Sequence, residues 1–167
     1  MRETERIASE LRRAYDGDPW HGPPMVKILE GLTAEQAAWP PLEGAHSIWE
    51  TLLHVIAWMR ETLRRVEGAE PAEPPGGDWP ALEARHPEAW DRTLADLSRV
   101  HEELEAKIVR FPEERLEEIV GRHDRDRALG TGVSFYVLLH GIVQHNVYHS
   151  AQIATLRRAL ASGRWEA

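Results

Sequence analysis

The sequence of 167 residues contains no cysteine. This absence excludes disulfide bonds, thiolate metal ligands and a cysteine nucleophile. A metal ion bound by this chain would have to be held by imidazole and carboxylate groups. The nine histidines and 28 acidic residues supply both kinds of ligand.

Positive charge is also scarce, because 20 lysines and arginines are outnumbered by 28 acidic residues, for a formal net charge of −8. Phosphate backbones bind clustered basic surfaces, so we expect no nucleic-acid partner. No run approaches the roughly 18–20 apolar residues of a membrane span, and the charged N-terminal segment lacks the apolar centre of a signal peptide. We therefore expect a cytoplasmic protein that acts on a small-molecule substrate and binds no membrane.

The alternation of apolar and polar residues that marks half-buried strands is missing, and helical spacing takes its place. Long helices are predicted over 3–15, 46–67, 87–110 and 133–160, with short ones over 25–32 and 33–38. Residues 68–86, rich in proline and glycine, form a long loop between the second and third long helices. Residues 113–120 fit either a further turn or a short extended piece. We predict an all-α fold, a four-helix bundle that forms a single domain over residues 1–167.

Capping patterns mark several predicted helix starts. Thr33 with Gln36, and Ser47 with Glu50, have the capping-box spacing, in which each side chain bonds the backbone N–H of the other residue. Thr131 is the predicted cap of the last long helix.

Two histidines lie four residues apart in the last long helix, where no proline interrupts the apolar pattern. His145 and His149 share one helix face, roughly 40° apart around the axis. Two imidazoles so placed can bind one metal ion or share one buried polar site. Gln152 falls on the same face and is a candidate to orient a ligand or a water. His54 lies in the second long helix, on a polar and aromatic face that suits the lining of a cleft.

Each of these residues also has a structural interpretation. A buried histidine more often bonds a backbone or side-chain group than a metal, and Gln152 can equally join two helices. Glu50, one turn before His54, and Glu61, two turns after it, are candidates for a catalytic general base or for orienting metal ligands. Both are alternatively capping or surface residues. The loops around Trp20 and Trp79 are candidates to cover the mouth of the site.

The segments SIWETLLHV, with its single mid-helix histidine, and HGIVQHNVYHSAQI resemble the DinB/YfiT-like superfamily. The resemblance implies a four-helix bundle that holds a divalent metal ion on His54, His145 and His149. It also implies a homodimer. Characterised relatives of this kind include metal-dependent transferases and isomerases that use a low-molecular-weight thiol, so the resemblance bears more on the fold and metal site than on the reaction.

Three imidazoles without a thiolate suit zinc or nickel, with iron or manganese as alternatives. Three protein ligands leave at least one coordination position for water or substrate, as in catalytic zinc sites. We therefore expect a metal-dependent thiol S-transferase or hydrolase that activates a thiol or water against a small electrophilic substrate. The alternative is a non-catalytic dimeric protein whose metal site is structural or vestigial and which binds a small apolar ligand.

Overall fold

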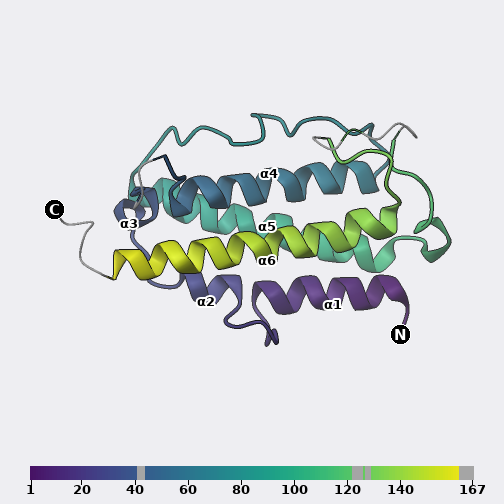
Figure 1. Ribbon diagram of the computed structural model, residues 1–167, viewed down its shortest axis with the longest axis horizontal. Helices are drawn as coiled ribbons and strands as arrows, with labels where there is room; N and C mark the ends of the chain where they lie inside the picture. The colour runs from purple at the N-terminus through teal and green to yellow at the C-terminus, as the bar shows by residue number, and fades with distance from the viewer. Residues whose placement is uncertain (41–43, 122–125, 127–128, 162–167) are drawn as a thin grey trace.

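The computed structural model describes residues 1–40, 44–121, 126 and 129–161 (Figure 1). The helices are α1 (Glu3–Tyr15), α2 (Met25–Leu29), α3 (Ala34–Ala38), α4 (Ile48–Val66), α5 (Pro87–Arg110) and α6 (Phe135–Leu160), with a 3-10 helix over Glu113–Arg115. The described residues form no named strand, so the predicted all-α class is confirmed. None of these helices, in the part of the chain described, is long and apolar enough to cross a bilayer.

The four long helices lie side by side around one hydrophobic core. α4 packs against α5 and α6, and α1 packs against the same two helices. These four pairs close a ring, as the helices of a four-helix bundle do. Buried apolar side chains from Ile7 on α1 to Leu160 on α6 belong to a single cluster inside the ring. The short helices sit at one end, where α2 packs on α6 and α3 packs on α4.

The predicted long loop between the second and third long helices is present as residues 67–86. Figure 1 shows this segment running back along α4, from the end of that helix to the start of α5. α5 therefore runs in the same direction as α4, whereas α6 runs in the opposite direction. Because the loop follows α4 along its length, it can contribute groups to a site built on that helix.

The two predicted capping boxes are confirmed. The hydroxyls of Thr33 and Ser47 each accept the backbone N–H of Gln36 and Glu50 at 3.2 Å. The return bonds run from the backbone N–H of Thr33 and Ser47 to the Gln36 and Glu50 side chains, at 3.1 and 2.8 Å. The start of α4, and with it the phase of every residue along the helix, is therefore set by local sequence.

The prediction that Thr131 caps the last helix is wrong. Ser134 is the cap of α6, and its hydroxyl accepts the backbone N–H of Val137. The reason is an antiparallel bridge between Ile119 and Ser134, which keeps the chain extended up to Ser134 and so delays the helix. The ambiguous segment before it combines both expected forms, a 3-10 turn at Glu113–Arg115 and the extended residue Ile119.

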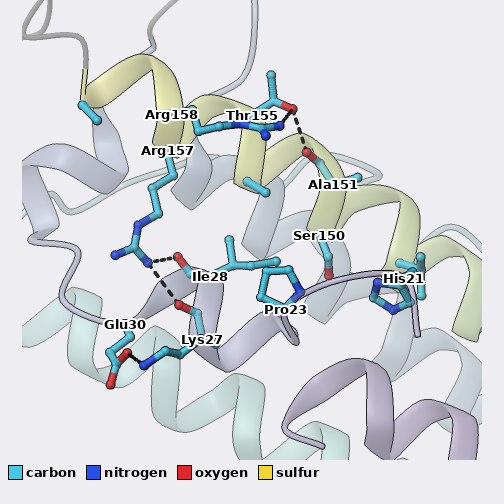
Figure 2. A pocket seen from close by; sticks show the side chains of 13 residues that line it. His21, Pro23, Lys27, Ile28, Glu30, Ser150, Ala151, Thr155, Arg157 and Arg158 are labelled. Carbon is cyan, nitrogen blue, oxygen red and sulfur yellow. Dashed lines mark hydrogen bonds and ion pairs between the residues drawn. The ribbon is translucent and has the colours of Figure 1, made fainter. Parts of the chain in front are cut away.

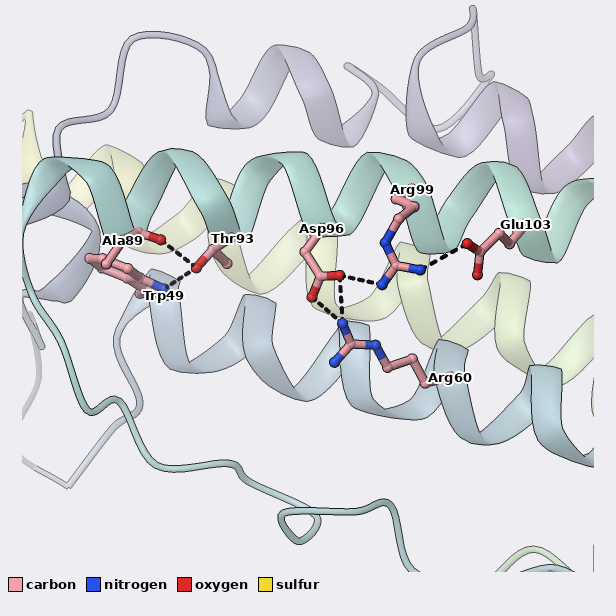
Figure 3. A network of polar contacts seen from close by, with 7 residues as sticks. All are labelled: Trp49, Arg60, Ala89, Thr93, Asp96, Arg99 and Glu103. Atoms are coloured by element: carbon pink, nitrogen blue, oxygen red, sulfur yellow. Dashed lines mark hydrogen bonds and ion pairs between the residues drawn. The ribbon is translucent and has the colours of Figure 1, made fainter.

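Polar contacts between α4 and α5 fix how these two helices lie against each other (Figure 3). Arg60 of α4 pairs with Asp96 of α5, which also pairs with Arg99 at 2.7 Å. Closer to the core, the buried Trp49 indole donates to the Thr93 hydroxyl at 2.9 Å. Exposed ion pairs contribute only about 0–1 kcal/mol each, so the buried indole, with its large apolar area, contributes more to holding α4 in place.

Candidate metal centre

His54 lies in the middle of α4, buried, with its ring held by the loop that passes alongside. Its Nδ1–H donates to the backbone carbonyl of Asp78 at 2.6 Å. A carbonyl oxygen only accepts, so Nδ1 carries the proton and Nε2 of the neutral ring presents a lone pair. The Asp78 carboxylate lies 3.4 Å from the same nitrogen and accepts the Trp58 indole N–H at 2.7 Å. The loop therefore fixes both the tautomer and the direction of the His54 ring.

His145 and His149 face His54 from α6. Their ring centroids lie 4.4 Å apart, and they are 5.0 and 4.6 Å from the centroid of His54. The Nε2 atoms of His54 and His145 are separated by 3.0 Å. One nitrogen from each of the three rings lies within 4.8 Å of the others. The packing of α4 on α6 thus brings the three predicted histidines to one point.

Partners on the remaining ring nitrogens direct the Nε2 atoms inward. His149 Nδ1 donates to the side-chain oxygen of Gln152 at 2.7 Å. His145 Nδ1 has a weaker partner, the Asn146 side-chain oxygen at 3.5 Å. Gln152 therefore lies where an imidazole is oriented, on the helix face that its spacing from His149 predicts. This arrangement is the one that metal-binding histidines adopt, with the free N–H bound to an acceptor.

The arrangement fits a divalent cation. One nitrogen of each ring faces the other two rings, and a single shared proton would join only one pair of these nitrogens. Zinc binds imidazole nitrogens at about 2.0–2.1 Å, which in tetrahedral geometry places two of them about 3.3 Å apart. The 3.0 Å between the Nε2 atoms of His54 and His145 is close to this separation.

Burial keeps His145 and His149 uncharged at neutral pH. Burial, reinforced by the neighbouring His149 and His54, lowers the pKa of His145 to about 4. Burial also lowers the pKa of His149, against the opposing effect of its hydrogen bond to Gln152. Because imidazole binds metals in its neutral form, both rings are in the binding form at pH 7.

Comparison with known families places this site in context. A family model described as the DinB superfamily matches residues 24–153, most of the chain and all three histidines. The chain belongs to the DinB superfamily. The resemblance expected from the two histidine-containing segments is therefore confirmed, and the converging triad agrees with a divalent-metal site. No curated protein and no solved structure matches the chain.

In this DinB-superfamily chain, the loop after α4 covers the histidines with an indole. Trp79 stacks on His54, with centroids 4.1 Å apart and planes inclined by 12°. His46 stacks on Trp79 in turn, at 3.7 Å. Of the two loops expected to cover the mouth of the site, the Trp79 loop does so, whereas the side chain of Trp20 is fully exposed.

The two glutamates proposed for catalysis have other partners. Glu50 closes the capping box of α4, where one carboxylate oxygen accepts the backbone N–H and the hydroxyl of Ser47, each at 2.8 Å. The buried Glu61 carboxylate accepts the Arg65 guanidinium and the backbone N–H of Ala72, each at 2.9 Å. Although burial works to raise it, these hydrogen bonds hold the pKa of Glu61 below its usual range. Glu61 therefore ties the loop to α4, and neither glutamate joins the ligand cluster among the described residues.

Asp78 belongs to the site but was not expected from the sequence. Asp78 acts on His54 mainly through its backbone carbonyl, and every residue has a carbonyl, so its identity carries no signal. Trp58 was expected on the same helix face as His54, from its i+4 spacing, although as a core or interface side chain. Its indole donates instead to the Asp78 carboxylate beside His54.

Proposed function

We propose that this chain is a metal-dependent enzyme that activates a thiol or a water molecule for transfer to, or hydrolysis of, a small electrophilic substrate. The proposal is carried by the convergence of three Nε2 atoms whose opposite ring nitrogens face acceptors. A structural zinc site fills four positions with protein ligands. The cluster has three ligands and no fourth in the described part of the chain, which supports an open, catalytic site.

The roles of the chain's own residues follow from their contacts. His54, His145 and His149 would hold the ion, and zinc or nickel suits them best, with iron or manganese as alternatives. Gln152 and the Asp78 carbonyl keep two of the rings turned inward by accepting their Nδ1 protons. A bound divalent ion lowers the pKa of a bound water or thiol and polarises a substrate carbonyl.

A nucleophile activated in this way releases a proton that the protein must accept. α4 carries two carboxylates, and we assign this role to Glu50 rather than Glu61. Only one Glu50 oxygen accepts hydrogen bonds from the described residues, whereas both oxygens of Glu61 are engaged. Because the chain has no cysteine, a thiol nucleophile would be a low-molecular-weight co-substrate from solution.

Metal content is the first test. Wild-type protein and His54→Ala, purified without an affinity tag, are compared by elemental mass spectrometry. We expect a near-stoichiometric divalent ion in the wild type and its loss in His54→Ala. His101→Ala is the matched control, since it removes a buried histidine outside the triad, and it should keep the ion. The loaded protein is then screened for transfer of thiols to electrophiles and for hydrolysis.

Three outcomes would contradict the proposal at different points. A wild-type protein without a divalent ion, even after dialysis against zinc and nickel, would overturn the metal site. An ion retained in full by His54→Ala would overturn the ligand set. A bound ion without turnover in either screen would overturn the catalytic role and favour the non-catalytic alternative.

A further inference from the structure

A cleft of about 520 Å³ lies beside the metal centre, between α6 and the segments that precede α4 and α5. Its lining includes His46 and Trp79 from those segments, and Tyr148, Gln152 and Leu156 from α6. Sites for small molecules enclose roughly 300–1,000 Å³. The cleft is therefore large enough for a ligand with one or two rings.

The cleft adjoins the imidazoles through side chains that line it. Trp79 stacks on His54, and Gln152 accepts the Nδ1–H of His149. The ring of Tyr148 lies edge-on to His149, with centroids 5.1 Å apart. A molecule in the cleft would thus lie one side chain away from the metal ligands.

No aspartate, glutamate, lysine or arginine is among the described residues that line the cleft. This absence is notable in a chain of which 29% of the residues are charged. A second cleft, between α2 and α6, is instead lined by Lys27, Glu30, Arg157 and Arg158 (Figure 2). Arg157 is held there, because its guanidinium donates to the backbone carbonyls of Lys27 and Ile28. The two cations that follow the cleft-lining part of α6 therefore face the other cleft.

The groups that a ligand would meet are flat, apolar or neutral donors. The Tyr148 side chain is 62% exposed, so one aromatic face remains open for packing. Gln152 uses its side-chain oxygen on His149, and its two amide N–H groups have no acceptor among the described residues. Ala151 and Leu156 add apolar surface.

We infer that this cleft binds an uncharged, planar molecule that carries a hydrogen-bond acceptor. An anion held in the cleft would lose water without meeting a lysine or arginine among the described lining residues, which is unfavourable, whereas a neutral ring loses little. The inference rests on the proposed function and names the class of molecule delivered to its metal centre. A thiol co-substrate that carries carboxylates would have to keep them outside the cleft.

A matched pair of probes tests this inference. Benzamide and benzoate share one ring and differ in charge, and their binding to the chelator-treated wild-type chain is measured by NMR titration, so that neither probe coordinates a bound ion. We expect benzamide to bind at least tenfold more tightly. Equal affinities, or no binding of either probe at millimolar concentration, would overturn the inference.

A charge variant locates the binding. Ala45→Lys adds a cation at a half-buried position that lines this cleft and not the second one, and we expect benzoate to bind about two- to fivefold more tightly. Gln144→Lys adds the same charge at an exposed position of α6 outside the cleft, and it should change neither affinity. Identical results for the two lysine variants would show that the probes bind elsewhere.

Failure of this inference is distinguishable from failure of the proposed function. Metal content is measured on every titrated sample, and the titration is repeated after zinc loading. Selective benzamide binding by a protein that never holds a metal would support the inferred cleft and contradict the proposed metal-dependent enzyme. A protein that holds its metal ion but does not bind benzamide would contradict only the inference about the cleft.

Discussion

Two buried histidine environments in this bundle differ in what their nitrogens face. The triad of His54, His145 and His149 lies between α4 and α6. His101 lies on α5, only 3% exposed, and stacks on Tyr15 of α1 with centroids 3.9 Å apart. Burial lowers the pKa of His101 to about 4, the value that His145 also has. Burial and a low pKa are therefore common to both environments.

The difference lies in the partners. His101 Nε2 has no hydrogen-bond partner in the described part of the chain, and a carboxylate oxygen of Glu105 is 3.7 Å away. In the triad, each Nε2 faces other imidazoles while the opposite nitrogen faces an acceptor. A core histidine and a metal ligand are thus separated by the convergence of lone pairs, and a perturbed pKa alone does not distinguish them.

Zinc binding should separate the two environments by the largest margin. At free zinc 1,000-fold above its dissociation constant, we expect the free energy of unfolding of the wild type to rise by about 4 kcal/mol. His145→Ala should lose this increase, because two imidazoles cannot complete the site. His101→Phe should keep it, whatever its own baseline stability. Urea unfolding with and without zinc measures the effect, and equal zinc responses of the two variants would erase the distinction.

The free energy of unfolding at acidic pH should instead depend on His101. His101 has a pKa of about 4 in the folded chain and about 6.5 when unfolded. The folded state binds fewer protons, so the contribution of His101 to stability is present above pH 6.5 and is lost as the pH falls toward 4. His101→Phe should reduce this loss by up to about 3 kcal/mol.

Urea unfolding of zinc-free protein between pH 4 and 8 measures this change in slope. Above pH 7 the wild type and His101→Phe should differ by a constant amount, which serves as the internal control. Parallel curves across the whole range would mean that His101 titrates normally in the folded chain.

A smaller effect is expected at Gln152, which orients His149. Loss of such an acceptor lowers metal affinity by about 10- to 100-fold, so Gln152→Ala should bind zinc more weakly by that factor. Gln152→Glu keeps an acceptor and should recover most of the affinity. Gln144→Ala, at another exposed glutamine of α6, is the control. Competition with a chromophoric chelator gives the affinities, and an unchanged value for Gln152→Ala would assign Gln152 to the surface.

Sequence patterns predicted the parts of this structure that depend on helical periodicity. α1 and α5 have the predicted bounds, since an apolar stripe defines each helix and Pro87 occupies the first turn of α5. Ser47 sets the start of α4, as its capping box predicts. The shared face of His145 and His149 follows from the helix period itself, so the spacing of the two residues in the sequence is enough to identify the pair.

The remaining features depend on contacts between segments distant in sequence. Asp78 bonds His54 because an irregular loop runs back along α4, and no periodic pattern encodes the path of such a loop, although its Trp79 was a candidate to cover the site. The predicted start of α6 is wrong for the same reason, since the bridge from Ile119 to Ser134 overrides the local cap at Thr131. His101 could not be singled out, because a single histidine in a helix gives no spacing to interpret.

The smallest expected effect is at Tyr148, and it tests whether the cleft wall contributes to metal binding by the triad. Tyr148 lines the cleft and forms a T-shaped contact with His149 rather than a hydrogen bond, so Tyr148→Ala should weaken benzamide binding about two- to tenfold, the range of one aromatic contact, and leave zinc affinity unchanged. Tyr136→Ala is matched, because Tyr136 is also an exposed tyrosine of α6 beside a histidine, His140, at 4.5 Å. It should change neither affinity. A fall in zinc affinity together with benzamide affinity in Tyr148→Ala would mean that the cleft wall also holds the metal ligands in place. The triad would then differ from His101 in the surface that surrounds it, and not only in the partners of its ring nitrogens.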